Sequence, residues 1–197
     1  MLRLLARSAR PTTGFIQYPE RWRVRFVDLS PMLFDDTLMA NLRYGENFAH
    51  PAAEVWALCA KIGMSDDLLG RGDMPVGDGG IKLALSARIH VSIARTLLSG
   101  ANLLLLSNAL DALGPAAAMV VIDVLDEWVR DRGVMCLASA HRDPSSGAER
   151  PRACRKKNTV VLSTKLPAVL ARAGSRIHLD ERDTERLFDD REEMECL

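Results

Sequence analysis

Residues 76–114 constrain the fold most, because they read in order as a glycine-rich loop, an amphipathic helix, a turn and a buried strand. Apolar residues at a spacing of four predict a helix over residues 85–97 with a polar face opposite. The apolar positions are Leu85, Ile89, Ile93 and Leu97, and the polar ones are Arg88, Ser92, Arg95 and Ser99. Gly100 follows as a C-terminal cap. Residues 103–106 are four leucines, too short a run for a helix and typical of a buried parallel strand. Ligands bind beyond the carboxyl ends of such strands, which makes Ser107 and Asn108 candidate site residues.

The same stretch carries short motifs in a characteristic order. IARTLL at residues 93–98 ends the helix, the leucine strand follows, and the loop DALG at residues 111–114 comes next. This order resembles the nucleotide-binding domain of ABC transporters. In that family an LSGGQ signature, a helix with an IAR-A-LL pattern, a Walker B strand ending in Asp-Glu and a SALD-type D-loop follow one another. The chemical positions depart from the family at the signature (Leu83, Ala84, Leu85, Ser86 and Ala87) and at Walker B (Ser107 and Asn108), while Asp111 stands in the D-loop.

Upstream segments resemble the same family. Residues 2–14 are similar to the helix after the P-loop and its closing turn, which would place Met1 just after a missing GxxxxGK[ST] motif. The alternative for this segment is a mitochondrial transit peptide, because its first ten residues are rich in arginine and contain no acid. A short strand at residues 24–27 leads to Leu29, which stands at the Q-loop glutamine position. Residues 36–45 follow the exporter-type pattern D-T-I-x-x-N-L-R-Y-G and predict a short helix that starts at Asp36 or Thr37 and stops at Gly45.

Two further helices and two strands follow from the apolar pattern. A helix within residues 51–70 would bury Val55, Leu58, Cys59 and Ile62. A helix from Pro115 to a stop at Gly133 would bury Ala118, Ile122, Leu125 and Val129. Strands are expected at residues 134–138 and again from residue 159. By resemblance, the family's switch histidine corresponds either to His141, which fits the upstream spacing and which we favour, or to Lys165, which fits the downstream spacing.

The resemblance implies an α/β fold with a mainly parallel sheet flanked by helices, like a P-loop NTPase or ABC ATPase that is incomplete at its N-terminus. Residues 1–180 are expected to form one degenerate domain, with a helical subdomain at about 46–100 and an insertion at about 143–158. Residues 181–197 read as an acidic tail. A length of 197 residues with 48% hydrophobic residues fits one soluble globular domain.

ATP hydrolysis in this family needs a backbone phosphate cradle with a lysine, Mg²⁺ held by a hydroxyl and an acid, and a group that positions water. The chain contains no GxxxxGK[ST] motif, and Lys82 reads as a solvated loop residue. Ser107 brings no charge to Mg²⁺, and Asn108 cannot accept a proton. Leu85 adds bulk where the signature has a glycine, and Ser86 is expected to cap the helix. We therefore predict that no catalytic site is intact. ATP and Mg²⁺ are the cofactors that the family resemblance implies, and their binding to this chain is not expected from its residues.

The resemblance implies another ABC nucleotide-binding domain or a transporter membrane domain as partner, docked against the signature-helix and D-loop face. The alternative is a fragment of an ATP-hydrolysing ABC exporter whose P-loop lies upstream of Met1. A net charge of +0 gives no global attraction to nucleic acid, and no apolar run is long enough to span a membrane. The four cysteines lack CxxC spacing, which favours reduced thiols and no metal site. A cytoplasmic location at the face of a membrane is expected, with mitochondrial targeting as the alternative.

Overall fold

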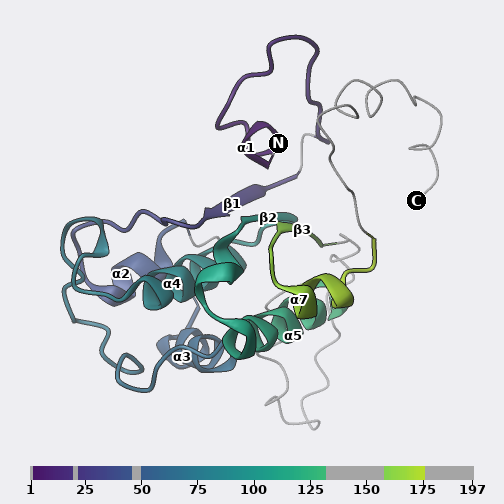
Figure 1. Ribbon diagram of the computed structural model, residues 1–197. Helices are drawn as coiled ribbons and strands as arrows, with labels where there is room; N and C mark the ends of the chain where they lie inside the picture. The colour runs from purple at the N-terminus through teal and green to yellow at the C-terminus, as the bar shows by residue number, and fades with distance from the viewer. Residues whose placement is uncertain (1, 20–21, 46–49, 132–157, 176–197) are drawn as a thin grey trace, which may run out of the picture.

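The computed structural model describes residues 2–19, 22–45, 50–131 and 158–175. Its elements in chain order are α1 (Leu2–Leu5), β1 (Val24–Asp28), α2 (Leu38–Arg43), α3 (Ala52–Lys61), η1 (Asp78–Gly80), α4 (Leu85–Leu98), β2 (Leu103–Ser107), η2 (Ala109–Ala112), α5 (Pro115–Asp131), β3 (Thr159–Ser163) and α7 (Pro167–Arg172). The helices α2, α3, α4, α5 and α7 lie on one side of the sheet, and the N-terminal segment with α1 lies on the other (Figure 1). None of the described helices is both long and apolar enough to cross a membrane.

The three described strands form a parallel sheet in the order β1-β2-β3. They run in register, so that their last residues, Asp28, Ser107 and Ser163, lie side by side at one edge. A parallel sheet with helices packed on it is the predicted α/β class, and the strands expected near residues 24, 103 and 159 are all present.

The central strand β2 is buried on both faces, as its four leucines predict. Leu104 and Leu106 belong to the main core beneath the sheet. Leu103 and Leu105 point to the opposite face, where α1 contacts β2, and are 5% and 0% exposed. The N-terminal segment therefore covers part of the second face of the sheet.

Helix α4 is the most enclosed helix of the described chain, contacting β1, α2, α3 and η2. Gly100 follows it with φ +66°, as expected of the predicted cap. Ser92 and Ser99 of the predicted polar face are buried. The Ser99 hydroxyl donates to the Thr96 carbonyl and accepts from Arg25 Nε at 3.1 Å, because neighbouring elements cover this side of the helix.

The short helices begin where their capping residues predict. Thr37 accepts a hydrogen bond from the Ala40 amide at the start of α2, and Gly45 lies just past its end with φ +76°. Helix α3 ends at Lys61, well before the limit of the predicted segment, and its apolar stripe is fully buried. The helix expected by resemblance within residues 2–14 is one turn, α1.

Helix α5 begins at Pro115, as predicted. Its expected apolar stripe is correct at Ala118, Ile122 and Leu125 but wrong at Val129, which is 36% exposed. Trp128 takes the last core position and is 1% exposed, because the larger indole lies on the side that faces the sheet. The stop at Gly133, the strand at 134–138, His141, the insertion up to residue 157 and the acidic tail lie outside the described residues.

Candidate functional site

The carboxyl edge of the sheet brings together most of the residues that the sequence singled out. Ser107 ends β2, Asn108 and Asp111 follow in the η2 turn, and Lys165 follows β3. Leu29 comes directly after β1 and is 41% exposed. Ligands of open α/β sheets bind at this edge, so it is the candidate site of the chain.

Asn108 ties the ends of β2 and β3 together. Its backbone is left-handed, with φ +52°, a conformation that asparagine adopts more readily than most residues. Its backbone N–H donates to the Ser163 carbonyl at 3.0 Å, and its side-chain Oδ1 accepts from the Ser163 hydroxyl at 2.9 Å. The side-chain oxygen at this position is thus occupied by a neighbouring hydroxyl.

Asp111 holds the loop that follows β3. Its carboxylate accepts from the Thr164 hydroxyl, and both of its oxygens accept from the Lys165 backbone N–H, at 3.0 and 3.1 Å. The Thr164 hydroxyl oxygen also accepts from the Leu166 N–H at 3.1 Å. Asp111 therefore fixes the backbone of Lys165, while the lysine side chain is exposed.

A second carboxylate of this edge, Asp28, is also engaged. Arg3 Nη2 donates to its Oδ2 at 2.6 Å, and the Leu29 N–H donates to its Oδ1 at 2.8 Å. The hydrogen bond from Arg3 holds the pKa of Asp28 below its usual value. Among the described residues, no three His, Cys, Asp or Glu side chains are grouped so that they could hold a metal ion.

The segment that aligns with the family's signature lies at the start of α4. A Cβ built at Gly80 would lie 2.7 Å from Leu33 Cδ1, so a side chain there would collide with the core.

Ala84 is the N-cap residue, and Ser86 lies within the first turn, so the expected capping role of Ser86 is wrong. The N-cap position is two residues before Ser86, at Ala84, and the helix begins at Leu85. Leu85 is 37% exposed, and Lys82 is exposed as predicted.

A cluster around Arg95 was missed by the sequence reasoning. Arg95 donates to the backbone and side-chain oxygens of Asn41, each at 2.9 Å, and to the Met32 carbonyl at 3.3 Å. Its guanidinium carbon lies 5.6 Å and 5.4 Å from the ring centroids of Phe34 and Tyr44. Burial lowers the pKa of Arg95. The sequence feature that could have indicated this cluster is Asn41, which lies between Leu38 and Leu42 in α2. An amide side chain buried at such a position needs hydrogen-bond partners.

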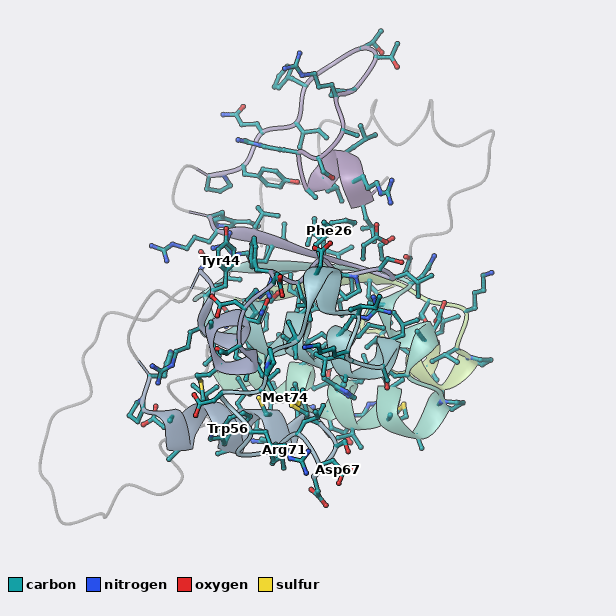
Figure 2. The ribbon with its side chains drawn as sticks, turned by 90° about the vertical axis from the view of Figure 1, so that its left-hand side faces the viewer. Phe26, Tyr44, Trp56, Asp67, Arg71 and Met74 are labelled. Carbon is teal, nitrogen blue, oxygen red and sulfur yellow. The ribbon has the colours of Figure 1, made fainter. Side chains whose placement is uncertain are left out.

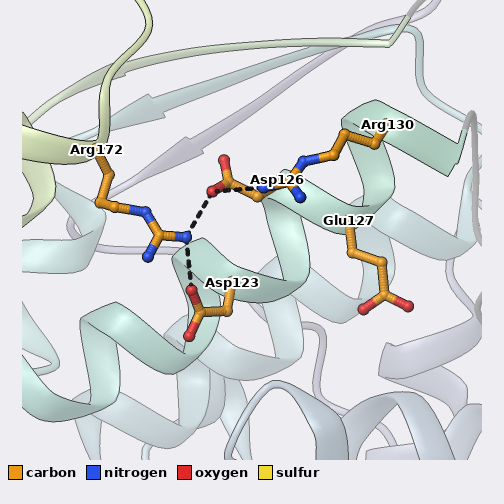
Figure 3. A pocket seen from close by; sticks show the side chains of 5 residues that line it. All are labelled: Asp123, Asp126, Glu127, Arg130 and Arg172. Carbon is orange, nitrogen blue, oxygen red and sulfur yellow. Dashed lines mark hydrogen bonds and ion pairs between the residues drawn. The ribbon is translucent and has the colours of Figure 1, made fainter.

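A shallow hollow on α5 and α7 is lined by charged side chains (Figure 3). Arg172 donates to Asp123 and Asp126, each at 2.8 Å, and Arg130 lies 3.6 Å from Asp126. These groups are largely exposed, where ion pairs contribute little to stability. The hollow begins eight residues along α5 from Pro115 and so lies away from the carboxyl edge of the sheet.

Comparison with known proteins gave relatives in sequence, whereas no family model matches the chain. The multidrug resistance-like ATP-binding protein MdlA of Escherichia coli is 34% identical over 62% of the chain and 21% of its own length. The mycobactin import ATP-binding/permease protein IrtB of Mycolicibacterium thermoresistibile is 35% identical over 67% of the chain and 25% of its own length. An ATP-dependent lipid A-core flippase of Pseudomonas savastanoi is 31% identical over 60% of the chain and 20% of its own length.

The fold is similar to that of a solved bacterial Atm1-family ABC exporter with ATP bound. The match has a TM-score of 0.51 and 23% identity, and it covers 72% of the chain and 21% of the exporter. The chain thus spans about a fifth to a quarter of the length of the relatives it matches.

Proposed function

Because this chain is related to ABC exporters in sequence and in fold, we propose that it is a degenerate nucleotide-binding domain that does not hydrolyse ATP by itself. It would act by pairing with an intact ABC domain or with the membrane domain of a transporter. The observation that carries the proposal is the hydrogen bonding of Asn108 to Ser163 at the position of the family's Walker B glutamate.

The donor set at the edge of the sheet does not fit the chemistry of Mg²⁺-ATP. Ser107 is neutral, and the Asn108 oxygen that would face water already accepts from Ser163. An amide cannot take a proton from water, and losing a general base typically costs about 10² to 10⁴ in rate. The two carboxylates of this edge, Asp28 and Asp111, are bound by Arg3 and by the loop after β3. No catalytic step is therefore assigned to these residues.

Of the two candidates for the switch position, Lys165 has the geometric support. It follows the strand that pairs directly with β2, and its backbone is bound to Asp111 of the D-loop. His141 lies outside the described residues. An exposed basic side chain at this place would attract an anion.

Exposed apolar side chains support a pairing role. Ile81, just after η1, is 80% exposed, and Leu85, the first residue of α4, is 37% exposed. Met32 is 80% exposed beside the Arg95 cluster. Phe34 and Tyr44 of that cluster are 48% and 56% exposed. Large apolar side chains that remain exposed can mark interaction sites in soluble proteins. The start of α4 belongs to the face that the family resemblance assigns to docking.

Nucleotide titration of the purified full chain, with and without Mg²⁺, tests the catalytic part of the proposal. We expect no Mg²⁺-dependent binding in the micromolar range and no turnover above that of buffer, with an intact ABC domain as positive control. Mg²⁺-dependent turnover that stops in Ser107→Ala or Asn108→Ala would refute it. The alternative, a fragment of an ATP-hydrolysing exporter, predicts that fusing a P-loop segment ahead of Leu2 restores ATP turnover without changes at Ser107 and Asn108.

Sedimentation with a purified nucleotide-binding domain from a related exporter tests the pairing part. We expect Ile81→Ser and Leu85→Ser to weaken association, because polar substitutions remove apolar area from the docking face. Leu170→Ser on α7 is the matched control, since Leu170 is 38% exposed but lies on a different surface. Equal effects of all three variants would contradict docking through α4.

A further inference from the structure

The zero net charge of the chain conceals a strong local asymmetry. Residues 1–26 contain six of the 26 basic residues, all arginine, but only one of the 26 acidic residues, Glu20. This segment therefore carries +5, and the remaining 171 residues carry −5. A basic segment of this density attracts anionic surfaces even when the whole protein is neutral.

The structure displays part of this charge away from the helical core. Residues 2–19 form α1, which packs on β2, and a loop that extends away from the sheet on the side opposite α4 and α5 (Figures 1 and 2). The loop is closed on itself, because the Tyr18 hydroxyl donates to the Leu5 carbonyl and the Arg7 guanidinium lies 5.3 Å over the Tyr18 ring. Arg7 and Arg10 are exposed, and residues 2–19 contain no acidic side chain.

Large apolar side chains before β1 are also exposed to solvent. Phe15 is 82% exposed and follows Gly14, whose φ of +77° marks the turn of the loop. Trp22, which precedes β1, is 40% exposed. Aromatic side chains beside arginines are typical of protein segments that lie in the headgroup region of a bilayer.

We propose that residues 2–19, the N-terminal basic loop, together with Trp22 bind the surface of an anionic lipid bilayer. Arg7 and Arg10 contact lipid phosphates, and Phe15 and Trp22 enter the headgroup region. A bilayer fits better than a nucleic acid because Phe15 projects from the turn of the loop, where it can insert into a layer. This binding is independent of ATP and of the pairing proposed above.

Flotation of the full chain with phosphatidylcholine vesicles, with and without phosphatidylglycerol, tests the proposal. We expect binding only to the anionic vesicles, and binding should weaken as salt screens the charges. Each arginine near such a surface contributes about 1 kcal/mol, or about fivefold in affinity. The double variant Arg7→Gln/Arg10→Gln should therefore bind about 25-fold more weakly.

The matched control is Arg71→Gln/Arg130→Gln, which changes the net charge equally at exposed positions on the helical side of the molecule. It should bind like the unchanged chain, and circular dichroism of each variant checks that the fold is kept. Equal weakening by both double variants would show attraction by overall charge and would overturn the proposal. Binding to a poly-U oligonucleotide without binding to anionic vesicles would overturn it in favour of nucleic acid.

Tryptophan fluorescence tests whether Trp22 inserts into the headgroup region of the bilayer. Trp22 emission should shift to the blue on adding anionic vesicles, and the shift should vanish in Trp22→Phe. The other two tryptophans lie among the helices, where Trp128 is 1% exposed and Trp56 of α3 packs against the core. Phe15→Ser should weaken binding while its salt dependence stays the same, since this change removes apolar area but no charge. A shift that persists in Trp22→Phe would overturn the inserted geometry.

Discussion

Replacing Asp111 by alanine tests whether the η2 turn holds the loop after β3. The carboxylate accepts from the Thr164 hydroxyl and, through both oxygens, from the Lys165 N–H. A hydrogen bond to a charged group contributes about 1.5–3 kcal/mol. Two such donors would give about 3–6 kcal/mol, but the carboxylate is half-exposed and water replaces part of what is lost. We therefore expect the free energy of unfolding to fall by about 2 kcal/mol.

Urea unfolding measures this change. With a slope near 2 kcal/mol/M, the midpoint should fall by about 1 M. Thr164→Val alone should cost less, and the double variant should show coupling of at least about 0.5 kcal/mol, because the two side chains share one bond. Asp67→Ala, at an exposed position in the loop after α3, is the control and should leave the midpoint unchanged. An unchanged midpoint in Asp111→Ala, or strict additivity with Thr164→Val, would refute the role given to Asp111.

Three other predictions follow from burial. Leu104→Ala should lower stability by about 2–5 kcal/mol in thermal unfolding, since Leu104 is fully buried, whereas Leu170→Ala should cost under about 1 kcal/mol. Burial raises the pKa of Cys59 to about 12, so mass spectrometry should find Cys59 unalkylated by iodoacetamide at pH 8 in the folded chain and alkylated in urea; rapid alkylation of the folded chain would contradict its burial. Burial lowers the pKa of His90, whose Nε2 has no hydrogen-bond partner within the described residues. The unfolded chain therefore binds a proton at His90 more readily than the folded chain, and the free energy of unfolding falls as pH drops below the usual pKa of about 6.5. The melting temperature should therefore fall less between pH 7 and pH 5 in His90→Gln than in the unchanged chain, and equal falls would contradict this assignment.

The local sequence pattern was sufficient to predict those helices and strands whose own residues show a clear apolar spacing or a capping residue. The spacing of leucines and isoleucines gave α4 and β2, and Pro115 gave the start of α5, because these features depend on residues within one or two turns of each other. The same reasoning placed Ser92 and Ser99 on a polar face but did not show that both are buried. Whether a helix has one or two covered sides depends on the elements packed around it, and a single helical pattern does not contain that information.

The residues of the candidate site could be predicted from the sequence, but the hydrogen bonds between them could not. The sequence identified Ser107, Asn108 and Asp111 as positions at the end of a strand. It did not show that β3, more than 50 residues further on, lies beside β2 and presents Ser163 and Thr164 to them. The order of strands in a sheet is set by tertiary packing, and the hydrogen bonds of Asn108 and Asp111 follow from that order. The Arg95 cluster was missed for the same reason, since it joins residues 54 positions apart.

The long separations within the sheet also affect how a newly made chain would fold. Strand β1 is synthesised early, yet its partner β2 begins 79 residues later, and β3 appears only after residue 158. Pairings of such high sequence separation form slowly. Until β3 leaves the ribosome, one edge of the leucine-rich β2 has no described strand beside it, and exposed apolar edges of this kind promote aggregation. Nascent chains halted between β2 and β3 should therefore depend on chaperones far more than chains released at full length.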